Sequence, residues 1–142
     1  MADEGPVLLD TGPLVALLAS RDAYHESCVK ALAGLAPPLL TCWPVLTEAA
    51  WLLRRRPRPL DHIQAAHDAG MFRLLPLEAD DLAPIAAIMR RYEDVGLQFA
   101  DASIVHLAER EGIHTVFTID RRDFSLVRLK RNRPLRTIPD VQ

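Results

Sequence analysis

The sequence predicts an α/β fold with a central, mainly parallel sheet covered by helices on both faces. Short apolar runs alternate along the chain with segments of helical periodicity, which is the pattern of parallel strands joined by helices. Acidic residues directly follow some of these runs, and open α/β sheets bind ligands at the carboxyl ends of their strands. A length of 142 residues, 49% of them apolar and 25% charged, fits one domain spanning residues 1–142.

The apolar runs define the strands of the expected sheet. They occupy residues 6–10, 38–42, 71–77 and 114–120, with 134–139 as a fifth strand at the sheet edge. The predicted sheet therefore has four or five strands. If the first and fourth strands are neighbours, the acids that follow them, Asp10 and Asp120, lie at the same end of the sheet.

The connecting segments are expected to be helices. They occupy residues 12–20, 22–35, 44–56, 60–70, 78–95 and 99–112. Pro13 suits the first turn of its helix, where a missing N–H costs nothing, and Gly112 suits the end of the last helix. Pro57 and Pro59 are expected to stop the 44–56 helix. Pro84 indicates that the 78–95 helix begins later than residue 78.

Composition and cysteine usage narrow the class of protein. No apolar run approaches the ~20 residues of a membrane-spanning helix, and the acidic start MADEGP lacks the positive charge of a signal peptide. Cys28 and Cys42 are the only cysteines and form no disulfide framework, so we expect reduced thiols in a cytoplasmic protein. The formal net charge of −2 does not by itself indicate a nucleic-acid-binding protein.

Four acidic residues stand out, and each has a structural interpretation as well as a functional one. Asp10 is a candidate turn or capping residue, Asp101 a candidate N-cap, and Asp120 a candidate turn residue. Glu48 lies among apolar neighbours in the 44–56 helix, although a surface position is the alternative.

The combination of these acids favours a metal site. A carboxylate near a buried strand end is costly unless it is paired, and several carboxylates together repel one another. A divalent cation offsets both costs, and oxygen ligands suit Mg²⁺ or Mn²⁺. Such an ion activates water and neutralises charge on a phosphodiester.

Other kinds of site find little support in the sequence. The five histidines have neither the H-x-x-x-H nor the Cys/His spacing of a zinc site, and we expect them to be surface or packing residues. The chain contains no P-loop and no G-x-G-x-x-G motif, which argues against a nucleotide cofactor. Ser103 has no partner that suggests nucleophilic catalysis. Trp43 and Trp51 are expected in the core or at a subunit interface rather than as platforms for stacked bases.

Four stretches, LLDTGPLVALL, VLTEAAWLL, FADASIVHLAE and TVFTIDRRDF, resemble those of the PIN-domain ribonucleases, in particular the VapC-like toxins of toxin–antitoxin pairs. They occur in the order and at the separations usual in that family, and together they span nearly the whole chain. The resemblance implies a small three-layer α/β sandwich and metal-dependent cleavage of RNA.

The resemblance also implies roles for particular residues. The catalytic, metal-binding acids are Asp10, Glu48, Asp101 and Asp120, with Asp123 as a further candidate ligand and Thr11 and Thr118 as supporting residues. Gly12 and Pro13 depart from the family pattern, in which these positions are more often Asn, Ser or aliphatic. The implied partners are an RNA substrate, an antitoxin and a second copy of the chain. Residues 43–53 and 83–89 are the expected dimer contacts.

Basic residues are concentrated toward the end of the chain. Seven of the seventeen Lys and Arg residues lie in sixteen positions: Arg121, Arg122, Arg128, Lys130, Arg131, Arg133 and Arg136. The stretch RRRPR at 54–58 forms a second cluster. These residues are either a solvated surface or a phosphate-binding rim beside the acids, for which Arg121 and Arg122 are best placed.

Three other functions compete with a nuclease. A receiver-type phosphoryl-transfer domain needs an acidic pair after the first strand, where this chain has only Asp10. A phosphatase with a D-x-D-x-T loop needs a second acid where Gly12 stands. The third alternative is a catalytically silent PIN-like module that only binds RNA or protein. The presence of every expected acid argues against such a module.

Overall fold

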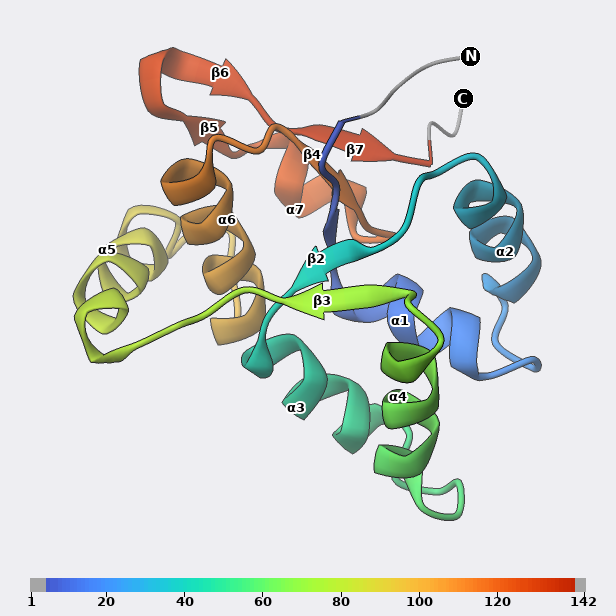
Figure 1. Ribbon diagram of the computed structural model, residues 1–142. Helices are drawn as coiled ribbons and strands as arrows, with labels where there is room; N and C mark the ends of the chain where they lie inside the picture. Colours follow the sequence, from blue (N-terminus) through green and yellow to red (C-terminus); the bar gives the residue numbers. More distant parts are fainter. Residues whose placement is uncertain (1–4, 140–142) are drawn as a thin grey trace.

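The computed structural model describes residues 5–139, except for the side chains of Arg121 and Arg131. Five strands form a parallel sheet in the order β3-β2-β1-β4-β7. They are β1 (Leu8–Leu9), β2 (Leu39–Thr41), β3 (Phe72–Leu74), β4 (Thr115–Phe117) and β7 (Arg136–Ile138) (Figure 1). The predicted central parallel sheet is confirmed, with residues 136–138 as its edge strand.

Helices cover the sheet in the three-layer arrangement expected of the fold. They are α1 (Thr11–Leu18), α2 (His25–Ala33), α3 (Trp43–Leu52), α4 (Pro59–Asp68), α5 (Leu82–Arg91), α6 (Phe99–Glu111) and α7 (Arg121–Ser125). Figure 1 shows α5 and α6 together on one side of the molecule and α1 to α4 on the other. The α3 helix also contacts α6, so the two groups of helices meet. No helix among the described residues is both long and apolar enough to cross a bilayer.

Two helix boundaries differ from the sequence-based prediction. The α3 helix ends at Leu52, well before Pro57, and the Arg54 guanidinium donates to the Trp51 carbonyl (3.0 Å), which satisfies part of the helix end. Pro59 starts α4 rather than stopping α3, since a proline in the first turn lacks only an N–H that would have no helical partner. As Pro84 indicated, α5 begins late, at Leu82, after a 3₁₀ turn at Ala79–Asp81.

The segment between β4 and β7 contains structure that the sequence did not predict. It holds the short α7 helix and an antiparallel hairpin formed by β5 (Arg128–Leu129) and β6 (Arg133–Pro134), with a 3₁₀ turn at Lys130–Asn132 between the two strands. Two-residue strands and a five-residue helix are too short to show a period in the sequence.

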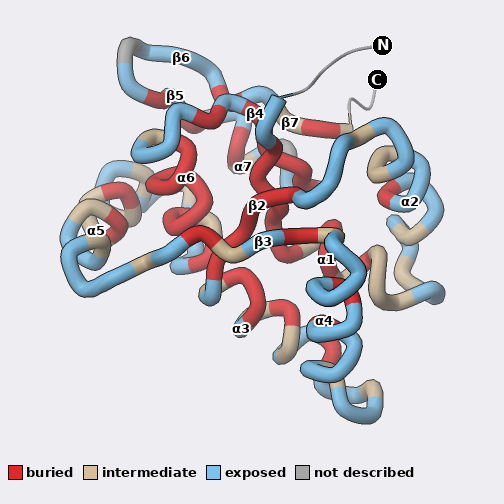
Figure 2. The backbone as a smooth tube through the Cα atoms, viewed as in Figure 1, coloured by how far each residue is buried: buried red, intermediate tan, exposed pale blue. Residues whose placement is uncertain are grey.

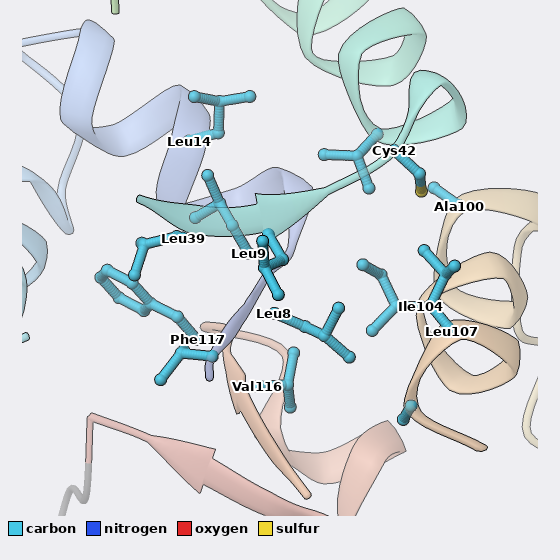
Figure 3. Close-up of a cluster of buried hydrophobic side chains, with 14 of the residues drawn as sticks. Leu8, Leu9, Leu14, Leu39, Cys42, Ala100, Ile104, Leu107, Val116 and Phe117 are labelled. Carbon is cyan, nitrogen blue, oxygen red and sulfur yellow. The ribbon is translucent and has the colours of Figure 1, made fainter. Parts of the chain in front are cut away.

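The core lies on both faces of the central strands. Leu8 pairs in register with Val116, and Leu9 pairs with Phe117, so successive side chains point to opposite faces of the sheet. Figure 3 shows Ile104 of α6 close to Leu8. Figure 2 shows the three central strands β1, β2 and β4 buried, whereas α2 and α4 are mostly exposed. The carboxyl ends of β1 and β4 are therefore fixed by packing from both sides.

Candidate active site

Asp10 follows β1 directly and lies in the interior of the protein. Its residue is 3% exposed, and its backbone N–H donates to the Phe117 carbonyl of β4 (3.0 Å). Asp10 occupies the N-cap position of α1, but its side chain makes no capping hydrogen bond. The capping interpretation is therefore wrong for this side chain. Its Oδ2 accepts a hydrogen bond from Thr118, and its Oδ1 is buried without a partner.

Thr118 joins the acids that follow the two neighbouring strands. Its hydroxyl donates to Asp10 Oδ2 (2.8 Å) and accepts from the backbone N–H of Asp120 (2.9 Å). Its own N–H donates to the Ile138 carbonyl at the end of β7. Thr118 thus orients the Asp10 carboxylate and fixes the backbone that leads to Asp120.

Glu48 enters the site from α3. It is half-buried, near the middle of the helix. The hydroxyl of Thr11 is buried and has no hydrogen-bond partner in the described structure, but it lies close enough to the Glu48 carboxylate to lower the pKa of that acid. Burial outweighs this effect, and the net pKa of Glu48 is raised. Thr11 and Glu48 therefore face each other beside Asp10.

Asp101 is positioned by a capping box at the start of α6. The backbone N–H of Gln98 donates to Asp101 Oδ2 (3.0 Å), and the Gln98 side chain accepts from the backbone N–H of Asp101. The N-cap is Gln98, so the interpretation of Asp101 as an N-cap is wrong. Sequence reasoning missed Gln98, although a polar residue three positions before an acid at a helix start is the signal of such a box.

Gly12 explains the departure from the family pattern after Asp10. A Cβ at this position would lie 2.5 Å from Ile119 Cγ1. The glycine therefore allows the first turn of α1 to approach the segment between Thr118 and Asp120. A side chain at position 12 would clash with Ile119, which lies between Thr118 and Asp120.

The five predicted acids affect one another's ionisation. Burial and then the charge of Asp101 raise the pKa of Asp10 to about 7. Burial raises the pKa of Asp101 to about 6, with further contributions from Glu48, Asp120 and Asp123. The pKa of Asp120 is raised by burial and by Asp123. Each of the five predicted acids therefore influences the ionisation of at least one other, and we call the set the acidic cluster.

The donor set of this cluster suits a divalent cation. Within residues 5–139, no three Asp, Glu, His or Cys side chains lie close enough together to enclose a metal ion. The buried Asp10 Oδ1 nevertheless has no partner, and the surrounding carboxylates raise the pKa of Asp10. A cation bound by these oxygen atoms would give the buried oxygen a partner and would reduce the repulsion between the carboxylates.

The predicted basic rim divides into separate parts. Arg122 is exposed on α7, two residues after Asp120; the Arg121 side chain lies outside the described part of the structure. Arg136, in contrast, pairs with Thr115 at the amino end of β4. The β5–β6 hairpin and the start of β7 therefore lie away from the acids, so the basic residues do not form one rim beside them.

The two tryptophans border the acidic cluster from outside the core. Trp43 and Trp51 are 60% and 62% exposed, so a core position is wrong for both. They line an open groove of about 620 Å³ that also includes Glu48, Leu82 and Phe99. Arg54 stacks on the outer Trp51 ring, with its guanidinium carbon 3.9 Å from the ring centroid. The groove is apolar and opens beside one of the site acids.

The parallel sheet with acids at its carboxyl edge is the architecture of a PIN domain. The chain belongs to the PIN domain family, which it matches over residues 7–130. Ribonuclease VapC26 of Mycobacterium tuberculosis is 27% identical over 124 residues, covering 86% of this chain and 92% of that protein. The crystal structure of Mycobacterium tuberculosis VapC20, a sarcin–ricin-loop-cleaving toxin, has the same fold. Its TM-score is 0.72 at 24% identity, over 82% of this chain and 92% of VapC20.

Proposed function

We propose that this protein is a metal-dependent ribonuclease that hydrolyses phosphodiester bonds, and that it is the toxin of a type II toxin–antitoxin pair. The observation that carries the proposal is the buried Asp10 carboxylate, which is oriented by Thr118, has one unpartnered oxygen and interacts with the carboxylates of Asp101 and Glu48. Similarity over most of the chain to a VapC ribonuclease supports the same function.

Asp10, Glu48, Asp101 and Asp120 would hold Mg²⁺ or Mn²⁺. Asp123 is the alternative to Asp120, because its carboxylate influences the ionisation of Asp120. When bound, such a cation lowers the pKa of water and neutralises charge on the phosphodiester. No covalent intermediate with the protein is required.

The side chains of the site have separate tasks. Thr118 and the Gln98 N–H each hold one oxygen of a carboxylate, which leaves the second oxygen of Asp10 and of Asp101 to face ligands. Fixing the acids before substrate arrives is the preorganisation that catalysis needs. The carboxylates that hold the cation would also help to deprotonate the attacking water.

Arg121 and Arg122 are proposed to bind the RNA backbone next to the scissile bond. Arg122 is exposed immediately beyond Asp120, where a guanidinium reaches a phosphate adjacent to the acidic cluster. Phosphate contacts supply much of the affinity for RNA. They position the strand without determining which base is recognised.

The groove beside Glu48 is proposed to be covered by a second copy of the chain. Trp43, Trp51, Leu82 and Phe99 are all exposed and come from three different helices around this groove. A patch of this kind on a small protein indicates an interface, and aromatic residues are enriched in such contacts. Of the two expected contacts, residues 43–53 contribute several side chains to the groove and residues 83–89 contribute Ile85. We also propose that the protein binds an antitoxin and that it acts in the cytoplasm.

The direct test is cleavage of an end-labelled structured RNA by the purified protein. We expect cleavage with Mn²⁺ or Mg²⁺, its loss with a chelator, and its return when the metal is restored. RNA binding without cleavage in saturating Mn²⁺ would instead identify a silent PIN-like module. Transfer of phosphate to Asp10, the signature of a receiver or phosphatase, is not expected.

A further inference from the structure

Positive charge is segregated into the last part of the described chain. Between Asp123 and Asp140 there are five Lys or Arg residues and no Asp or Glu. The whole chain has a formal net charge of −2, so the remainder is clearly acidic. The basic segment consists of the β5–β6 hairpin and the start of β7, and we call it the basic hairpin (residues 128–136).

The basic hairpin lies at the opposite end of the sheet from the acidic cluster. Arg136 pairs with Thr115, the first residue of β4, whereas Asp120 lies beyond the last. Arg133 donates to His114 Nε2 (2.8 Å), just before β4 begins. In Figure 1 the hairpin is at the top, while α1, which follows Asp10, begins at the lower end of β1. These cations therefore do not contact the phosphate that is cleaved.

The cations of the hairpin face a wider basic surface. Lys130 lies between two shallow hollows, of about 190 and 310 Å³. The first also contains His114 and Arg133, the second contains Arg91 and Arg110, and Glu109 lines both. Arg91 and Arg110 are paired with acids, but within residues 5–139 Lys130 has no acidic partner. Lys130 is therefore available to bind an anion.

The hairpin is held firmly against the body of the protein. The Tyr92 hydroxyl accepts from the Arg128 N–H (3.0 Å) and donates to the Arg128 carbonyl (3.3 Å). Leu129 and Leu135 are buried in the core. The exposed cations are thus carried on a fixed backbone, which reduces the entropy lost when they bind a ligand.

We propose that the basic hairpin is a second RNA-binding surface, which contacts the phosphate backbone of a folded RNA at a distance from the cleaved bond. This inference rests on the proposed ribonuclease function and specifies its substrate class. A firmly held segment that exposes Lys130 and Arg133 and has no acid of its own fits a polyanion. Because the acids and the hairpin are at opposite ends of the sheet, one RNA must be large and structured to reach both. A short single strand occupies the acidic cluster alone.

The test compares wild-type protein with a double variant that carries both Lys130→Ala and Arg133→Ala. Fluorescence anisotropy measures binding to bulk transfer RNA, as a folded probe, and to a short single-stranded oligoribonucleotide. We expect the double variant to bind the folded RNA roughly tenfold more weakly at moderate salt, with a salt dependence smaller by about two phosphate contacts. Binding of the oligoribonucleotide and its rate of cleavage stay unchanged.

A matched control removes the same charge elsewhere. Arg21→Ala with Lys30→Ala alters exposed positions at and before α2, and it is expected to keep wild-type binding. Lys130→Ala alone, which breaks no ion pair in the described structure, is expected to remove about one phosphate contact without affecting folding. Wild-type salt dependence in both hairpin variants, or an equal loss in the control, would overturn the inference. A wild-type protein that cleaves neither RNA contradicts the proposed function instead, whatever the hairpin variants bind.

Discussion

The Thr118 hydroxyl donates a 2.8 Å hydrogen bond to Asp10 Oδ2, although the two residues are 108 positions apart in the sequence. The pairing of β1 with β4 brings them together. The same hydroxyl accepts from the Asp120 N–H, so one threonine couples the first and last acids of the site. The organisation of the cluster therefore depends on a neutral residue as well as on its carboxylates.

Thr118→Val keeps the shape of the side chain and removes both hydrogen bonds of its hydroxyl. We expect at least a tenfold lower rate of RNA cleavage, because Asp10 loses its orientation, and a loss of about 1–2 kcal/mol in the free energy of unfolding. Thr118→Ser retains the hydroxyl and serves as the control. Single-turnover kinetics and urea denaturation measure the two effects. Equal cleavage rates in the valine and serine variants would show that this hydroxyl does not organise the site.

The stability of the metal-free protein should depend on Asp10. The pKa of this residue is about 7 in the fold, against an ordinary value of 3.8. The protonated form is therefore favoured in the folded state, and stability falls as pH rises from about 4 to about 7. For this group alone, the limiting slope is about 1.4 kcal/mol per pH unit.

Asp10→Asn removes this titration and should flatten the dependence of stability on pH. Chemical denaturation in the presence of a chelator, at several pH values, measures the free energy of unfolding. Asp68→Asn, at an exposed position at the end of α4, should retain the wild-type slope. The same slope in all three proteins would mean that Asp10 is not the group responsible.

The exposed groove residues should determine assembly. We expect a dimer by light scattering at micromolar concentration and a monomer for Trp43→Lys with Trp51→Lys, since two charges would be buried in the contact. Tyr24→Lys alters an apolar residue that is 51% exposed elsewhere on the surface, and it should stay dimeric. A wild-type monomer at this concentration would contradict the proposed interface.

Arg122→Ala should weaken RNA binding while leaving the chemistry largely intact. Loss of one phosphate contact lowers the slope of the logarithm of the binding constant against the logarithm of the salt concentration by about one. The cleavage rate at saturating RNA should change little, because the side chain holds the substrate rather than the reacting atoms. A large fall in that rate, with unchanged affinity, would instead give Arg122 a part in the chemical step.

The sequence predicted the sheet and its acids because both follow from strong local signals. Leu8 and Leu9 belong to a buried apolar run, and the position of Asp10 directly after it indicated a strand-end acid. The exposure of Trp43 and Trp51 was partly missed because apolar character does not distinguish a core from an interface. The Thr118–Asp10 hydrogen bond depends on strand order, which a single sequence does not specify.

The basic hairpin shows a different limit of sequence reasoning. Arg122 and Arg136 belong to one charge-rich stretch in the sequence, but they lie toward opposite ends of β4. The intervening α7 helix and the hairpin reverse the chain within a few residues, and neither is long enough to show periodicity. Basic residues that are adjacent in the sequence therefore lie on two separate surfaces, one at Arg122 beside the acids and one on the basic hairpin, and we expect these surfaces to have different roles.

The central claim is that the acidic cluster is the catalyst, and Asp101→Asn tests it most directly. The substitution nearly preserves shape and removes one negative charge from a crowded site, so folding should be intact and the metal-free stability equal or higher. In single-turnover cleavage of a structured RNA with saturating Mn²⁺, we expect the rate to fall by about three orders of magnitude relative to wild type and to Asp68→Asn. Cleavage by Asp101→Asn at the wild-type rate would contradict the account.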